Sequence, residues 1–255
     1  MRTFNVITLF LICLYINTIK AIVVISLGGD CTVASILRDT GIRKAAYPFD
    51  WMLAHFISVY RSVEDDFQKF LDEATLKIAD DDKRIIVNAY GISFVHDFPT
   101  VHHSAALTDT ETHEWNEIRS DWRNFIVPIR EKYQRRIERF KSALSGSEHV
   151  FLIRYGVGES EKDLIIQFRD LLIKRYPNLN FTFVAVGGAP ELGKSWDIEK
   201  IKNFYVIYGG PHFLSNWRNI FDSLGINSAN SRSCYSQDDE EDDLVCDGTC
   251  HHNFK

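Results

Sequence analysis

A run of apolar, mostly β-branched residues that ends in two glycines and a helical pattern constrains the fold of this chain most. The run covers residues 22–27, and the helical pattern starts at residue 32. Such a segment is typical of a buried strand, a tight turn and a helix. Cys31 stands at the junction, where unpaired backbone N–H groups and the helix dipole favour a thiolate, the nucleophilic form of cysteine. The alternative interpretation is a small, buried, unreactive cysteine.

The alternation of strands and helices continues in the second half of the chain. Strand patterns cover residues 149–155, 181–186 and 204–208, and helical patterns cover residues 159–176 and 212–224. Two strands joined by a helix form a βαβ unit, which requires a parallel sheet. We therefore predict one α/β domain over residues 22–226, with a mostly parallel, Rossmann- or flavodoxin-like sheet flanked by helices.

The middle of the chain predicts additional elements. Residues 84–90 and 92–96 have strand patterns that can pair across Gly91, and residues 51–60 and 63–71 have helical patterns. A long charged helix is expected over residues 113–144. We expect Pro128 to break or kink it, because proline cannot donate the helical hydrogen bond.

Both ends of the chain differ from its centre. Arg2 precedes an apolar run over residues 6–16, and Ala21 follows a short polar stretch. This pattern is typical of a secretory signal peptide over residues 1–21, so we expect a secreted or lumenal protein. The run is too short for a stable membrane span, and an ordinary N-terminal element is the alternative. Residues 227–255 form an acidic tail with cysteines and histidines, which we expect to be disordered.

Charge and motif content exclude several classes of function. The formal net charge of −6 argues against nucleic-acid binding. The glycine pair lacks the remainder of a dinucleotide-binding fingerprint, and the cysteines and histidines of the tail have no strong zinc-binding spacing. We therefore expect no cofactor and no metal. The oligomeric state is not indicated by any pattern.

Nucleophilic catalysis by Cys31 requires a base and a group that orients the base. Among nine histidines, two follow expected strands: His96, next to Asp97, and His212, after the last strand. Asp50 is a second carboxylate that could orient a base. A buried, hydrogen-bonded structural histidine is the alternative interpretation for each.

Three motifs carry a family resemblance: Ser-Leu-Gly-Gly-Asp-Cys at residues 26–31, Pro-Phe-Asp-Trp at 48–51 and His-Asp-Phe at 96–98. With these motifs, residues 23–221 resemble an uncharacterised family described as papain-like cysteine peptidases. The resemblance implies Cys31 as nucleophile, His96 as base and Asp97 or Asp50 as the orienting group. The alternating strands and helices nevertheless differ from papain, whose cysteine helix faces a barrel-like domain.

The reaction that this resemblance implies is hydrolysis or acyl transfer through a thioester on Cys31, with an unidentified peptide, ester or glycan as substrate. Backbone N–H groups of residues 29–31 would stabilise the oxyanion. Gly28, Gly29, Asp30 and Trp51 are the residues expected to contact the substrate.

Two other interpretations remain open. The Gly-Asp-Cys at residues 29–31 is similar to the Gly-Asp-Ser block of esterases with a flavodoxin-like sheet, which implies His212 as the base. Alternatively, the domain is a non-catalytic module that binds a glycan, a nucleotide-sugar or a protein partner. A peptidase-like site requires Cys31 near His96, an esterase-like site requires it near His212, and a binding module requires neither.

Overall fold

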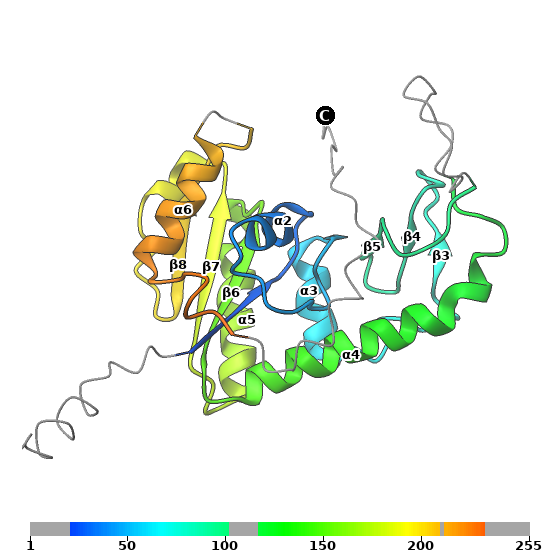
Figure 1. Ribbon diagram of the computed structural model, residues 1–255, viewed down its shortest axis with the longest axis horizontal. Helices are drawn as coiled ribbons and strands as arrows, with labels where there is room; N and C mark the ends of the chain where they lie inside the picture. The colour runs from blue at the N-terminus through cyan, green and yellow to red at the C-terminus, as the bar shows by residue number, and fades with distance from the viewer. Residues whose placement is uncertain (1–20, 102–116, 210–211, 233–255) are drawn as a thin grey trace, which may run out of the picture.

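Four parallel strands form the main sheet of the protein (Figure 1). The computed structural model describes residues 21–101, 117–209 and 212–232, and all structural statements refer to them. The sheet has the order β1-β6-β7-β8, with the strands β1 (Ile22–Ser26), β6 (His149–Tyr155), β7 (Phe181–Gly187) and β8 (Ile201–Tyr205). The predicted α/β fold with a mostly parallel sheet is confirmed.

Helices cover both faces of this sheet. One face packs against α2 (Thr32–Asp39) and α6 (Phe213–Ser223); the other packs against α3 (Phe56–Glu64), α4 (Ile126–Ser145) and α5 (Lys162–Arg175). Side chains alternate between the two sides of a strand. Val24 of β1 therefore packs on the face covered by α2 and α6, and Ile25 packs on the face covered by α3, α4 and α5. Burial on both faces explains the nearly continuous apolar pattern of β1 and β6.

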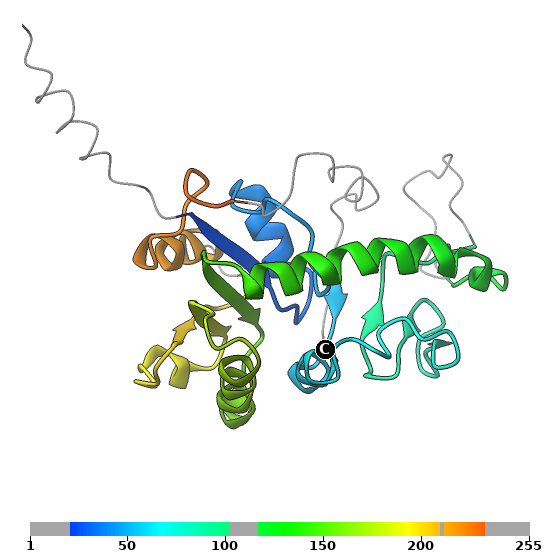
Figure 2. The same ribbon diagram turned by 90° about the horizontal axis from the view of Figure 1, so that it is seen from below.

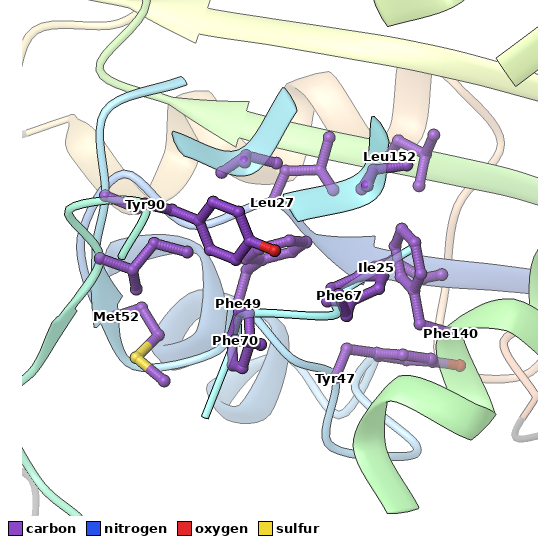
Figure 3. Packing of buried hydrophobic residues seen from close by; sticks show 14 of the residues in the cluster. Ile25, Leu27, Tyr47, Phe49, Met52, Phe67, Phe70, Tyr90, Phe140 and Leu152 are labelled. Atoms are coloured by element: carbon purple, nitrogen blue, oxygen red, sulfur yellow. The ribbon is translucent and has the colours of Figure 1, made fainter. Parts of the chain in front are cut away.

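A second, antiparallel sheet lies beside the first, and α4 runs along both (Figures 1 and 2). It consists of four two-residue strands in the order β2-β5-β4-β3, with β2 at Met52–Leu53, β5 at Ser93–Phe94, β4 at Ile86–Val87 and β3 at Lys77–Ile78. Phe49 lies at the centre of the shared aromatic core (Figure 3), with its ring centroid 5.7–6.0 Å from those of Phe67, Phe70 and Phe140.

Several element boundaries differ from the sequence prediction. Strand β8 begins at Ile201 rather than at residue 204, because an edge strand tolerates the polar residues that precede the apolar run. Pro128 lies in the first turn of α4, where its missing N–H breaks no helical bond, so the predicted break is wrong. A short 3-10 helix, η2 (Trp122–Phe125), precedes α4. The further short helices are η3 (Glu159–Glu161) and η4 (Pro190–Gly193).

Helix α3 also differs from the two helices predicted in this region. It begins at Phe56, after the short strand β2, and ends at Glu64. Asp66 and Phe67 have positive φ angles of 60° and 64°, which stop the helix.

The first residues of the expected tail belong to the folded part of the chain. The Ile22 N–H donates to the Asn230 carbonyl over 3.0 Å, and the Arg232 N–H donates to the Ile22 carbonyl over 2.9 Å. Ser231 is buried and its hydroxyl donates to the carbonyl of Ile42. The predicted signal peptide, apart from Ala21, and residues 233–255 lie outside the described residues.

Candidate active site

The turn that follows β1 places Cys31 at the carboxyl end of the parallel sheet. Gly28 and Gly29 have φ angles of 69° and 109°. A Cβ atom on Gly29 would lie 2.5 Å from the carbonyl oxygen of Tyr155, so only glycine fits against β6 here. Cys31 directly precedes α2 and is 3% exposed. The turn and the neighbouring strand together fix the position of the thiol.

The thiol of Cys31 contacts the imidazole of His96. The distance between Cys31 Sγ and His96 Nε2 is 3.6 Å, across 65 positions of sequence. His96 lies just after β5, which pairs with β2 and β4 in the small sheet. The contact therefore joins the two sheets of the molecule, and it has the geometry of a nucleophile and its base before substrate is bound.

Trp51 packs against Cys31 in an unusual backbone conformation. It is 6% exposed, has a φ angle of 64° and shares a small buried cluster with Cys31 and Ala34. The guanidinium carbons of Arg38 and Arg43 lie 5.2 Å and 5.9 Å from the centroid of its ring. A positive φ in a bulky residue is strained, and such strain is common at functional sites. Trp51 thus contacts both the cluster that contains Cys31 and the guanidinium groups of Arg38 and Arg43.

Asp50 stabilises the turn that precedes Trp51. Its buried carboxylate accepts hydrogen bonds from Arg43 Nε and Nη2 over 3.2 Å and 3.1 Å, and from the Tyr47 N–H over 3.0 Å. These contacts explain why an acidic residue occupies this apolar motif. They give Asp50 a role in holding the Trp51 segment, in addition to any role as an orienting carboxylate.

Asp97 directs its carboxylate to α4. Its Oδ1 forms an ion pair with Lys132, and its Oδ2 accepts a hydrogen bond from the Tyr133 hydroxyl over 2.9 Å. His96 and Asp97 both lie in the bend that follows β5, so the alternation of side chains along a strand does not apply to them. The structure thus brings the Asp97 carboxylate to Lys132 and Tyr133 of α4.

His212 lies at the start of α6 (Phe213–Ser223). It is exposed and immediately precedes α6, where its backbone carbonyl accepts bonds from the Asn216 N–H and the Ser215 hydroxyl. These contacts make His212 part of the start of α6. The imidazole for which the structure shows a contact with the Cys31 thiol is that of His96.

The side chains of Ser26 and Asp30 accept hydrogen bonds from backbone N–H groups near the turn. The Gly28 N–H donates to the hydroxyl of Ser26 over 3.1 Å, and the Thr32 N–H donates to the Asp30 carboxylate over 2.8 Å. Asp30 therefore satisfies one of the unpaired amides at the start of α2. The amides of Val33 and Ala34 in this first turn have no acceptor within the helix.

Arg154 is a site residue to which the sequence analysis assigns no role. Its side chain is 4% exposed, and it donates to the carbonyls of Leu27 and Ala54 over 3.3 Å and 2.8 Å. Burial lowers the pKa of Arg154 to about 10, while Glu161 and Asp30 act in the opposite direction. Arg154 links the end of β1 to the segment after Trp51. A charged residue inside an apolar strand pattern was the available signal.

The described residues contain neither a cluster of three or more His, Cys, Asp or Glu side chains arranged for a metal nor a helix able to cross a membrane.

The fold and the site define an α/β protein in which a buried cysteine at the carboxyl end of the parallel sheet contacts a half-buried histidine. The family model described as "Putative papain-like cysteine peptidase (DUF1796)" matches residues 22–188, which include both residues of the pair, and the chain belongs to this family. "Uncharacterized protein R408" of Acanthamoeba polyphaga mimivirus is 22% identical over 220 residues, which cover 76% of this chain and 91% of the relative. No solved structure matches the chain.

Proposed function

We propose that this protein is a cysteine hydrolase that transfers the acyl group of an amide or ester to Cys31 and then to water. The observation that carries the proposal is the 3.6 Å contact between Cys31 Sγ and His96 Nε2. Membership of a family described as papain-like cysteine peptidases supports the same chemistry. The substrate itself is a compound with an accessible carbonyl, and a peptide, an ester or an acylated glycan would each fit that description.

The reaction proceeds in two balanced steps. His96 takes the thiol proton, the sulfur attacks the carbonyl carbon to form a C–S bond, and the bond to the leaving group breaks as that group takes the proton from His96. Water then attacks the thioester and gives a proton to His96. The C–S bond breaks, the acid is released and the sulfur recovers its proton.

The surroundings of Cys31 support both the thiolate and the oxyanion. The N-terminal turn of α2 presents backbone amides that favour negative charge on the sulfur. The N–H groups of residues 29–31 are the donors that we assign to the oxyanion of the tetrahedral intermediate.

Alkylation of Cys31 by iodoacetamide, followed by mass spectrometry as a function of pH, tests the proposal without a known substrate. We expect Cys31 to react at pH values at which an ordinary cysteine is protonated. His96→Ala should remove this reactivity at low pH, whereas His212→Ala should leave it unchanged.

Other outcomes would contradict the proposal. A shift caused by His212→Ala alone would indicate the esterase-like arrangement. A Cys31 that is inert, or that is unaffected by either substitution, would favour a non-catalytic module that binds a glycan, a nucleotide-sugar or a protein, since a thiol that is 3% exposed can also be purely structural.

A further inference from the structure

We propose that Lys132 and Tyr133 of α4 are positioning residues that hold His96 against Cys31 by fixing Asp97. This inference rests on the proposed function, because it assigns a role only if the Cys31–His96 pair is reactive. It adds two residues, both distant in sequence from the motifs that resemble the family.

The contacts between α4 and Asp97 are close and largely buried. Lys132 Nζ lies 2.5 Å from Asp97 Oδ1, with the two side chains 20% and 6% exposed. The Tyr133 hydroxyl donates to Asp97 Oδ2 over 2.9 Å, and Tyr133 is 1% exposed. Each oxygen of the carboxylate therefore has its own donor on α4. Since Asp97 is bonded covalently to His96, these two contacts restrict the backbone that carries the base.

Tyr133 also contacts the segment on the nucleophile side of the site. Its hydroxyl lies 3.9 Å from Met52 Sδ, and Met52 directly follows Trp51, which packs against Cys31. Met52 is in turn paired with Phe94 in the small sheet. One hydroxyl group thus touches both the segment that packs on the thiol and the segment that carries the imidazole.

The rest of α4 anchors the same helix to the nucleophile side. Arg139 Nη1 donates to the Ala46 carbonyl over 2.7 Å, and the Phe140 ring packs edge-on against Phe49, with centroids 6.0 Å apart. Figures 1 and 2 show α4 extending along both sheets. The helix is therefore a common support for the two halves of the site, and a small displacement between reacting groups is enough to slow a reaction strongly.

The ion pair is better explained by positioning than by stability. A buried ion pair must overcome the desolvation of both charges, and apolar residues of similar volume often stabilise a fold as well or better. Two directional contacts on one carboxylate, however, define its orientation, which an apolar contact does not. Because Asp97 follows His96 in the sequence, a fixed orientation of its carboxylate also restricts the position of His96.

The test measures the pH dependence of Cys31 alkylation by iodoacetamide together with the melting temperature. Lys132→Met and Tyr133→Phe should each slow alkylation near pH 6 about tenfold. Lys132→Arg, which keeps the charge, should recover most of the rate. Lys141→Met is the matched control. Lys141 also lies on α4 but pairs with Asp66, where the two side chains are 34% and 54% exposed, so its loss should change neither rate nor pH profile.

A Lys132→Met protein with a lower melting temperature but an unchanged pH profile would overturn the inference, because the pair would then be structural only. If Lys132→Met does not fold, the same criterion applies to Tyr133→Phe, which removes one hydroxyl group. If His96→Ala leaves the wild-type profile unchanged, the proposed function fails first, and the positioning role fails with it.

Discussion

Gly29 lies at a position in the turn before Cys31 where there is no room for a side chain. Its φ angle is 109°, and a Cβ atom would lie 2.5 Å from the Tyr155 carbonyl oxygen. We expect Gly29→Ala to destabilise the fold by about 3 kcal/mol or more, from backbone strain and overlap with β6. Urea unfolding measures this change.

Gly156→Ala is the control for Gly29→Ala. Gly156 also has a positive φ angle, 76°, but a Cβ atom there would meet nothing within 4 Å. This substitution should therefore report backbone strain alone, about 1 kcal/mol. Equal effects of the two substitutions would show that the approach of Gly29 to β6 is less tight than the structure indicates.

We expect the protein to lose stability in alkaline solution because of Tyr155. Burial raises the pKa of Tyr155, and the Asp30 charge and Tyr208 raise it further. The raised pKa means that Tyr155 stays neutral in the folded state at pH values at which it ionises in the unfolded state. Its contribution to the free energy of unfolding is therefore complete below the pKa of the unfolded state and is lost as pH rises toward the pKa of the folded state. Between pH 10 and 11 the wild type should lose about 1 kcal/mol that Tyr155→Phe does not lose.

Urea unfolding of both proteins from pH 8 to pH 11 measures the difference. Parallel curves across this range would mean that Tyr155 ionises equally easily in both states. Absorbance of tyrosinate in the folded protein provides an independent measurement, because Tyr155 should not ionise with the exposed tyrosines.

At the scale of elements, Asn88 holds the hairpin that leads to His96. Its amide donates to the Phe70 carbonyl, and its Oδ1 accepts from the N–H groups of Tyr90 and Ile92, each over 3.0 Å. We expect Asn88→Ala to destabilise the protein by about 2–3 kcal/mol, because buried polar groups lose their partners. It should also slow the low-pH alkylation of Cys31, since β4 and β5 position His96.

Asn203→Ala is a matched control for Asn88→Ala at another place in the fold. Asn203 on β8 makes three comparable side-chain bonds, to the carbonyls of Leu192 and Lys194 and from the Trp196 N–H. Its loss should lower stability by less than that of Asn88, because Asn203 is only half-buried and water can replace part of its bonds. Below the melting transition, however, it should leave Cys31 alkylation unchanged. A slowed reaction in both variants would indicate a general loosening rather than a local effect on His96.

Long, strongly patterned elements were predictable from the sequence, and short ones were not. The apolar runs of β1, β6 and β7 identify strands because both faces of the sheet are buried. The two-residue strands β2 and β3 are too short for any periodicity to identify. Their pairing depends on contacts between distant segments, such as that of Met52 with Tyr133 of α4, and on turns such as that at Asp66, whose positive φ angle no composition pattern indicates.

At the scale of the whole molecule, the candidate site combines segments that the sequence separates widely. Cys31 and His96 carry local signals, a turn before a helix and a polar pair after a strand, so both could be selected as candidates. Lys132 carries no such signal, because a lysine on a charged helix is usually solvated, and Arg154 is marked only by the charge that it places in an apolar strand pattern. Their roles follow from packing across the molecule.

We expect residues 1–21 to direct the protein into the secretory pathway and to be removed there. Strand β1 begins at Ile22, directly after the expected cleavage position. In a secretory host we expect the full chain to enter the medium with Ile22 as its first residue, as mass spectrometry would show. Leu11→Asp, which interrupts the apolar run, should retain it inside the cell. A secreted protein with an intact N-terminus would contradict this expectation.

The hydrogen bonds between Ile22 and residues 230–232 also cover the beginning of an edge strand that could otherwise pair with a second molecule. Strand β1 lies at the edge of the parallel sheet, and the returning chain pairs with the beginning of that edge. A chain that ended at residue 226 would leave those backbone groups available to a strand from another molecule. Such a shortened protein should therefore associate with increasing concentration in sedimentation experiments, while one ending at residue 232 should not. A segment that contributes nothing to the candidate chemistry would then decide whether the protein stays dispersed.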